Sequence, residues 1–338
     1  MANDHFTGGS LWRKRAFLPR KQSSEGIDGR QLRVAGSGSL ILGAIPECAS
    51  TPIVPYSTTF TLSKGASEMK NPICTSTIKV LIRGGGDLAS GVAWRLHQCA
   101  FKILITEIAQ PMAVRRKVSF CEAVYDGQTE VEGVVAVLIK DADGVHDVWA
   151  QGHIPVLVDP QAQAKGLIKP DVMVDAILAK KNLGTMLEDA PLVIALGPGF
   201  AAGQDVHFVV ETNRGHHLGR LLTSGSAEPD TGIPGPVQGV TTDRVLRAPT
   251  DGTWQTPSDI GDLVRKGDQV GTVSHKPVYA LIDGVLRGLI RPGLSVKKGF
   301  KIGDIDPRGN REFCGTISEK ALAIGGGVLE GILRYYKR

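Results

Sequence analysis

The sequence predicts a mixed α/β protein: a mostly parallel sheet, a small all-β domain after it, and a closing helix. Two observations predict this architecture. From Ile78 onward, short apolar runs alternate with glycine turns and with helical spacing, which is the pattern of β-α-β units. After Pro236, two segments of the chain repeat each other without a gap. Neither copy of the repeat can bury its apolar face alone, so the two copies are expected to form one β domain.

The sheet is predicted from the order of its first elements. Residues 78–83 form an apolar run that ends in three glycines, residues 88–100 have helical spacing, and residues 101–107 form a second apolar run that ends on an acid. Because consecutive strand–helix–strand units build parallel sheets, an open and mostly parallel sheet is the simplest arrangement. Further strands are expected at 134–139, 154–159, 171–177 and 192–196, with a helix near 141–152, and the α/β domain is assigned to residues 78–235.

The first glycine turn carries a nucleotide-binding signal. Gly84, Gly86 and Ala89 have the G-x-G-x-x-A spacing of a Rossmann turn, placed after a strand and before a helix whose first N–H groups are free to bind phosphate. Glu107 ends the second strand, where an acid accepts a ribose hydroxyl. Asp87 would repel a pyrophosphate unless its carboxylate points away or holds a metal. Two interpretations stay open: a turn kept for packing alone, or a Rossmann-like cofactor site formed by Gly84, Gly85, Gly86, Asp87 and Glu107.

A second glycine turn follows the strand at 192–196. Gly197 and Gly199 lie at the carboxyl end of that strand, where open α/β sheets bind ligands, and they are assigned to the same cofactor site. If residues 205–211 are extended, Asp205, His207 and Glu211 share one face, which suits a divalent ion or acid–base chemistry. The alternative is a polar row that faces solvent. The candidate catalytic residues are His207, Glu211, Arg214 and His216, and the metal is left unassigned.

Four arginines receive separate interpretations. Arg115 and Arg116 follow the second strand, near the expected mouth of the nucleotide crevice. They could grip a phosphate or a carboxylate, or they could be a solvated pair in a loop. Arg287 and Arg308 are interpreted as ordinary loop charges.

The repeat and the closing helix complete the chain. Residues 248–273 and 280–305 align, and each contains a Gly-x-x-Val-x-Lys-Gly turn. Such paired half-motifs resemble a biotinyl/lipoyl-type barrel-sandwich domain, which is predicted over residues 236–307. Residues 308–338 are predicted to end in a helix that packs on the α/β domain, with Ser318 as its N-cap. Its three glycines, 325–327, predict the close approach of a backbone or a ligand, since each costs about 1 kcal/mol relative to alanine inside a helix.

Composition narrows the class of protein. The chain has 338 residues, of which 42% are hydrophobic, so it can build real cores. No basic stripe interleaved with aromatic residues accompanies the net charge of +5, and this excludes a nucleic-acid surface. No apolar run approaches the roughly 20 residues of a membrane span, so a soluble protein with no membrane contact is expected. Five scattered cysteines without a CxxC pair fit the reducing cytoplasm. Residues 1–77 are predicted to be a disordered or misassigned N-terminal extension, with Met69 as the natural start.

Several long motifs together resemble one family. The segments IRGGGDLASGVAWRLHQCAFKILITEIAQPMAVRR, EAVYDGQTEVEGV, LGPGFAAGQDVHFVVETNRGHHLGR, GVLRGLIRPGLSVKKGFKIGDIDPRG and KALAIGGGVLEGIL are similar to the YqeB family over residues 78–338. That family is described as an accessory protein of the selenium-dependent molybdenum hydroxylase system.

The resemblance implies a role in maturation. An accessory protein of this kind would help to sulfurate, selenate or insert the molybdenum cofactor of a xanthine-dehydrogenase-like hydroxylase subunit, its expected partner. The expected ligand is a small nucleotide-like molecule, either NAD(P) or a molybdopterin nucleotide. Whether the chain is an enzyme stays open. Two other functions remain alternatives: an NAD(P)-dependent oxidoreductase that needs no partner, and a non-catalytic assembly scaffold.

Overall fold

The computed structural model describes residues 73–337. The prediction for residues 1–77 therefore lies almost wholly outside the described residues. Within residues 73–337, no helix combines the length and the apolar character that crossing a membrane requires.

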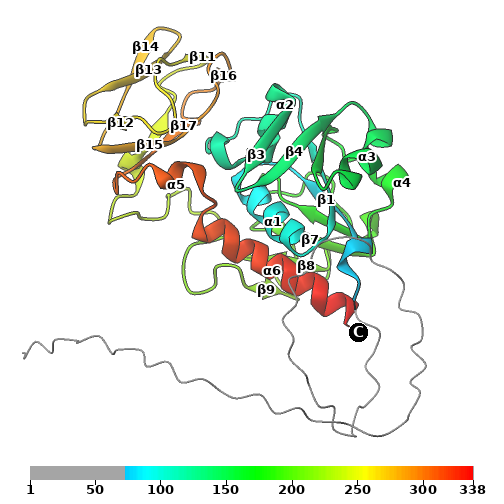
Figure 1. Ribbon diagram of the computed structural model, residues 1–338. Coiled ribbons are helices and arrows are strands. Elements are labelled where there is room, and N and C mark those ends of the chain that lie inside the picture. Colours follow the sequence, from blue (N-terminus) through cyan, green and yellow to red (C-terminus); the bar gives the residue numbers. More distant parts are fainter. Residues whose placement is uncertain (1–72, 338) are drawn as a thin grey trace, which may run out of the picture. The chain divides into compact units, whose positions relative to one another are not determined.

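A nine-stranded, mostly parallel sheet forms the α/β part of the structure (Figure 1). Its strand order is β3-β4-β5-β2-β1-β6-β7-β8-β9. Only the two edge pairs, β3 with β4 and β8 with β9, are antiparallel. The chain builds from β1 to β2 and β5 on one side and then returns to place β6 on the other side of β1, so the order reverses at β1. Its strands are β1 (Lys79–Arg83), β2 (Lys102–Glu107), β3 (Gln128–Val131), β4 (Val134–Ile139), β5 (Ile154–Val158), β6 (Val172–Asp175), β7 (Leu192–Leu196), β8 (Phe208–Val210) and β9 (Leu221–Leu222).

The elements predicted for the α/β region are confirmed, with ends that differ by no more than two residues for the strands. The expected helix after the first glycine turn is α1 (Asp87–Gln98), and the one near 141–152 is the shorter α3 (Val145–Ala150). The extended segment expected over 205–211 is only β8, because a turn occupies the residues before it. The remaining helices are α2 (Ala123–Asp126), α4 (Lys165–Ile168), α5 (Glu312–Gly315) and α6 (Glu319–Tyr336).

Two apolar layers cover the two faces of the sheet. Val80, Ile82 and Ile103 pack with α1 and α6 on one face. The neighbouring positions Leu81 and Leu104 pack on the other face with α3 and α4. Because side chains alternate along a strand, these near-continuous apolar runs are buried on both sides, as parallel strands require.

Two four-stranded antiparallel sheets follow the large one, with orders β10-β17-β15-β12 and β14-β13-β11-β16. The two copies of the repeat pair reciprocally. The N–H of Lys266 donates to Asp283, and the N–H of the equivalent Lys298 donates to Asp251. Each half therefore completes the other. The strands are β10 (Val245–Arg247), β11 (Gly252–Gln255), β12 (Leu263–Val264), β13 (Gln269–Val273), β14 (Lys276–Tyr279), β15 (Gly284–Leu289), β16 (Ser295–Val296) and β17 (Lys301–Asp306).

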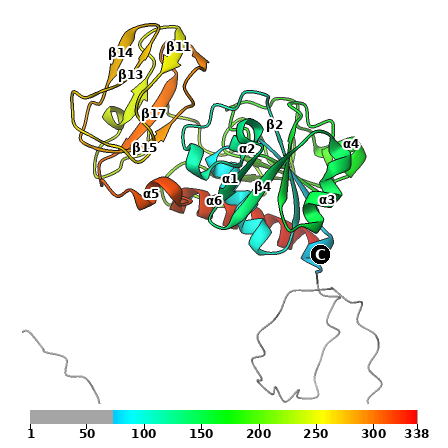
Figure 2. The same cartoon turned by 45° about the horizontal axis from the view of Figure 1, so that its top comes forward.

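Helix α6 runs alongside α1 in both Figure 1 and Figure 2. Ser318 caps it by accepting the N–H of Ala321, as the sequence predicts. The close approach expected at its glycines is confirmed. A Cβ on Gly325 would lie 3.1 Å from the carbonyl oxygen of Gly91, and one on Gly327 would overlap the carbonyl oxygen of Gly219. A Cβ on Gly326 would have no neighbour within 4 Å.

Substituting the adjacent glycines Gly326 and Gly327 by alanine should therefore change the free energy of unfolding in opposite directions. Gly327→Ala should lower the free energy of unfolding by about 1–3 kcal/mol, because the added methyl forces the helix away from the loop at Gly219. Gly326→Ala should raise it by roughly 0.5–1 kcal/mol through helix propensity. Urea denaturation followed by circular dichroism measures both. Changes of the same sign would contradict the packing described here.

Candidate functional site

A cavity of about 900 Å³ lies at the carboxyl ends of the central parallel strands. Its wall includes residues at or just after the ends of β1, β2, β5 and β6, among them Gly86, Glu107 and Pro160. The strand order reverses at β1, and open α/β sheets bind ligands where the order reverses. The first cavity thus occupies the place that the sequence predicts for a nucleotide.

In the first glycine turn, Gly84 and Gly85 pack closely against other parts of the chain, whereas Gly86 does not. Gly84 has φ +92°, and a Cβ there would lie 3.1 Å from the carbonyl oxygen of Ala176. A Cβ on Gly85 would lie 2.9 Å from the backbone nitrogen of Cys121. Gly86 has φ −67° and would have no neighbour within 4 Å. Packing therefore explains the first two glycines, whereas only Gly86 leaves open the space that a ligand needs.

Two carboxylates stand at this turn. Glu107 accepts the N–H of Gly85 at 2.8 Å and the N–H of Ile108 at 2.7 Å. Burial raises the pKa of the Glu107 carboxyl, against the opposing effect of these two hydrogen bonds. Asp87 begins α1, which has no side-chain cap, and its carboxylate lies 4.0 Å from Arg115. Glu107 thus lines the cavity and already accepts the N–H of Gly85, and its assignment to a ribose hydroxyl stays a prediction.

A buried ion pair beside the turn was not predicted. Arg83, at the end of β1, is 4% exposed and donates to the hydroxyl of Thr185 at 2.5 Å and to Asp175 at 3.4 Å. Asp175, at the end of β6, also accepts the hydroxyl of Thr185 at 2.6 Å. The signal in the sequence was a single charge at the end of each of two apolar strands. The pair joins β1 to β6 beside the first cavity.

A second cavity, of about 400 Å³, adjoins the first. The two share Asp87, Leu88, Arg115, Leu178 and Lys301. The second is more polar because its wall takes charged side chains from several elements. These charged residues are Asp87, Arg115, Lys180, Arg214, Glu228, Asp230, Arg244, Arg287, Lys301, Asp304 and Lys320.

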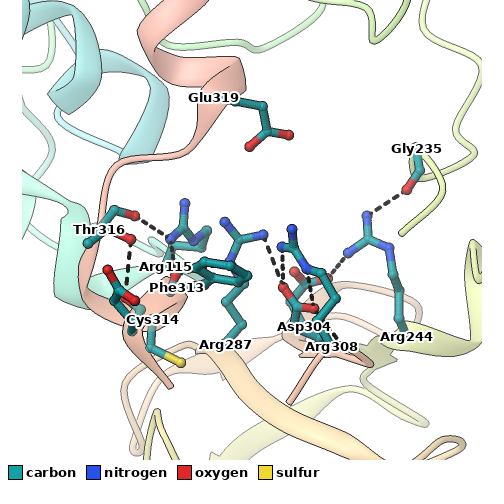
Figure 3. A network of polar contacts seen from close by, with 12 residues as sticks. Arg115, Gly235, Arg244, Arg287, Asp304, Arg308, Phe313, Cys314, Thr316 and Glu319 are labelled. Atoms are coloured by element: carbon teal, nitrogen blue, oxygen red, sulfur yellow. Dashed lines mark hydrogen bonds and ion pairs between the residues drawn. The ribbon is translucent and has the colours of Figure 1, made fainter. Parts of the chain in front are cut away.

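The guanidinium groups of four arginines lie in a row, with the Glu319 carboxylate facing them (Figure 3), and all but Arg308 line this cavity. In order along the row they belong to Arg115, Arg287, Arg308 and Arg244. Arg115 and Arg287 are anchored on one acceptor, the carbonyl oxygen of Phe313, at 2.8 and 3.1 Å. Like charges are thus held side by side by the backbone.

The structure corrects the sequence interpretation of Arg287 and adds Lys320 to the cations of this cavity. Arg287 is not a loop charge, because it lies in the middle of β15 and is only 6% exposed. Its burial lowers the pKa of its guanidinium, and the neighbouring Arg115 acts in the same direction. Lys320, in the first turn of α6, received no role from the sequence. Burial lowers the pKa of its ammonium, and the charge of Arg214 adds to the effect.

The structure does not bring the four predicted catalytic residues together. His207 precedes β8 at its amino end, where its Nδ1 accepts the N–H of Val193 and its ring lies edge-on to Tyr335. Burial lowers the pKa of His207. His216 is exposed and lies against His217. Neither histidine lines either cavity.

Glu211 and Arg214 have structural partners. Glu211 is 3% exposed, and its two carboxylate oxygens accept the N–H groups of Asn213 and Glu228 at 2.7 Å each. It therefore ties together two segments of the second cavity's wall. Arg214 lines that cavity and pairs with Glu319.

The second glycine turn is likewise fixed by packing. Gly197 has φ +74°, and a Cβ there would lie 2.5 Å from the hydroxyl of Thr212. Gly199 has φ +108° and is packed against the backbone of Lys181. Pro198 between them lines the second cavity. Among residues 73–337, no group of three His, Cys, Asp or Glu side chains could hold a metal ion.

Comparison with known proteins supports the resemblance to the YqeB family. Over 254 residues, the chain is 49% identical to the Escherichia coli (strain K12) protein named "Uncharacterized protein YqeB". This match includes 75% of the chain and 47% of that protein, so the chain spans about half the length of this relative. No protein-family profile matches the chain.

Solved structures give only distant likenesses. One is the product-bound ectoine utilization protein EutE (DoeB) from Ruegeria pomeroyi, 12% identical over 67% of this chain and 56% of that one, with a TM-score of 0.19. A succinylglutamate desuccinylase/aspartoacylase from Rhodobacter sphaeroides is 14% identical over 68% and 84%, with a TM-score of 0.23. TcdA (CsdL) is 12% identical over 78% and 90%, with a TM-score of 0.24. Similarity this weak carries no argument about function.

Glu211→Gln distinguishes a structural role from a catalytic one. An amide can accept only one of the two N–H groups, so the other loses its acceptor and the free energy of unfolding should fall by about 1–3 kcal/mol. Urea denaturation measures this, and amide hydrogen exchange at Asn213 and Glu228 should accelerate. The exposed His216→Gln serves as a control with an expected change within about 0.5 kcal/mol. Unchanged stability in Glu211→Gln would return Glu211 to the list of candidate catalytic groups.

Proposed function

We propose that this chain is an accessory protein that binds a nucleotide-like ligand in the first cavity and takes part in the maturation of a molybdenum hydroxylase. The observation that carries the ligand proposal is the position of that cavity, at the carboxyl ends of β1, β2 and β6 where the strand order reverses. A volume of about 900 Å³ is sufficient for a cofactor-sized molecule.

The residues of the first cavity suit the sugar and base of such a ligand. Glu107 has further lone pairs beside the two that accept N–H groups, so it can also accept a ribose hydroxyl. Met112, Val114 and Leu178 supply apolar wall against which a flat ring can pack. Gly86 lets the ligand approach the uncapped first turn of α1. NAD(P) and a molybdopterin nucleotide both have this chemistry.

The hydroxylase role rests on the likeness to the YqeB family. In this proposal the ligand is a cofactor or its precursor, and the partner is a xanthine-dehydrogenase-like subunit. A cytoplasmic location fits the thiols of Cys99, Cys121 and Cys314, which form no disulfide among the described residues. The intertwined β10–β17 region, interpreted as a barrel-sandwich domain, would then be a docking module for the partner.

Gly86→Ser tests the first cavity without disturbing the fold. A serine hydroxyl can cap α1 and occupy the N–H groups that a ligand would use, while no protein atom lies within 4 Å of the new Cβ. The wild type should be stabilised against thermal unfolding by one member of the set NAD, NADP, ATP and CTP, because a ligand of the native state raises its melting temperature. In the variant the affinity should fall at least about tenfold, with the stability of the unliganded protein unchanged or slightly higher.

Gly326→Ala is the matched control, since it adds a methyl at a glycine outside both cavities. If none of the four nucleotides stabilises the folded wild type, the nucleotide proposal is wrong. A hydroxylase co-expressed with each variant then tests the second half of the proposal. Equal hydroxylase activity with the wild type, with Gly86→Ser and without the protein would exclude a maturation role.

A further inference from the structure

The second cavity contains more positive charge than its acids neutralise. Seven cationic side chains and four acidic ones line it. The acids nearest to the row of arginines are already bound by close partners. Asp304 pairs with Arg244, and Asp306 pairs with Arg308 at 2.6 Å.

Lys180 and Arg214 also pair closely, with Asp230 and Glu319. The four other cations have no acid closer than 3.5 Å. Arg287 lies 3.5 Å from Asp306, and Lys301 lies 3.5 Å from Asp304. The nearest acid to Arg115 is 4.0 Å away. Within residues 73–337, the ammonium of Lys320 makes no hydrogen bond or ion pair. Under-neutralised cations therefore converge on one small space.

Donor groups of these cations are also left without acceptors. Arg115 uses one terminal nitrogen on the carbonyl oxygens of Phe313 and Thr316, but its buried Nε has no partner. Its side chain is 9% exposed, so water does not substitute freely. Burying charge and donors in this way destabilises a folded chain unless an anion joins them.

We propose that the second cavity is a binding site for a tetrahedral oxyanion of the phosphate class, held by Arg115, Arg287 and Lys320. Two guanidinium groups are fixed on the Phe313 carbonyl, and each keeps further N–H donors of the kind that bind phosphate. Lys320 supplies a point charge from the first turn of α6. Lys301, which borders both cavities, adds a fourth positive charge.

This site does not require a nucleotide in the first cavity. The same chemistry fits a free oxyanion and the terminal phosphoryl group of a nucleotide whose base lies in the first cavity. The two sources share the cations of the second cavity and differ only in whether the first cavity contributes.

Lys320→Gln tests the site, because the ammonium that it removes has no ion-pair partner, so no acid is left unpaired. Isothermal titration calorimetry with inorganic pyrophosphate at low ionic strength should show binding to the wild type. The affinity should fall by on the order of tenfold to a hundredfold in Lys320→Gln, as expected for the loss of one charge-assisted contact. Arg334→Gln, which removes an exposed charge from the last turn of the same helix, should bind as the wild type does.

The proposal is overturned if pyrophosphate does not bind the wild type, or if Lys320→Gln and Arg334→Gln bind it equally. ADP then identifies the source. If ADP binds the wild type more tightly than pyrophosphate and Gly86→Ser removes that difference alone, the site holds the phosphoryl end of a nucleotide. If ADP binds no more tightly than pyrophosphate and its affinity is unchanged in Gly86→Ser, the site binds a free oxyanion. Pyrophosphate binding with no nucleotide binding leaves this site standing and rejects the nucleotide proposal.

The burial of Lys320 also predicts how the free energy of unfolding depends on pH. Its ammonium faces Arg214 and Lys301, and the acids Asp87 and Glu211, and burial lowers its pKa from the ordinary lysine value of 10.5. Between the folded and unfolded pKa values the unfolded chain binds more protons, so the free energy of unfolding rises with pH there. Lys320→Gln lacks this penalty. Its stability relative to the wild type should therefore be greatest near neutral pH and should decline as the pH approaches 10.5, measured by urea denaturation without added anion. A difference that does not vary with pH would contradict this.

Discussion

The close approach of α6 to the large sheet is the constraint on which both cavities depend. Gly325 lets the helix reach the backbone of α1 at Gly91, and Gly327 lets it reach the loop at Gly219. A helix held further out would move its first turn, which carries Ser318 and Lys320, away from the second cavity. The position of a functional charge is thus set by backbone contacts two turns further along the same helix. The close contacts at Gly325 and Gly327 explain why this helix contains glycines there, although glycine weakens a helix.

The two cavities divide the charges of the site between them. Asp87 and Glu107 stand at the glycine turn, and Glu107 occupies the N–H of Gly85 that a dinucleotide-binding turn would direct to pyrophosphate. The positive charges that would balance a phosphate lie instead at Arg115 and in the second cavity beyond it. A ligand that spanned both would place its sugar beside Glu107 and its phosphates beyond Arg115. The fold is of a familiar kind, but its electrostatics favour a different direction for the anionic end of the ligand.

Sequence periodicity predicted the sheet well because the apolar pattern within each strand or helix depends on which of its own side chains are buried. Gly84, Gly86 and Glu107 line the first cavity, and the strand, turn and helix that position them are local and could be predicted for the same reason. Their assignment to a cofactor stays a prediction. The row of Asp205, His207 and Glu211 was less informative. It required a seven-residue strand, and β8 has three residues, so the period of two did not apply across the whole segment. His207 consequently lies at the opposite end of β8 from Glu211, and Glu211 binds two backbone N–H groups rather than a metal.

The cations of the second cavity come from distant segments of the chain, so no local pattern could assemble them. The repeat nevertheless contains a signal for some of them. Its two halves have the same backbone at equivalent glycines, with φ +107° and +87° at Gly261 and Gly293. Yet the positions equivalent to Arg287 and Asp306 in the first half are Gln255 and Ser274, which are exposed. The fold of the half-motif therefore does not need these charges. Arg287 and Asp306 are buried in only one of two structurally equivalent copies, so their charges reflect the surroundings of that copy rather than its fold. Arg287 lines the second cavity.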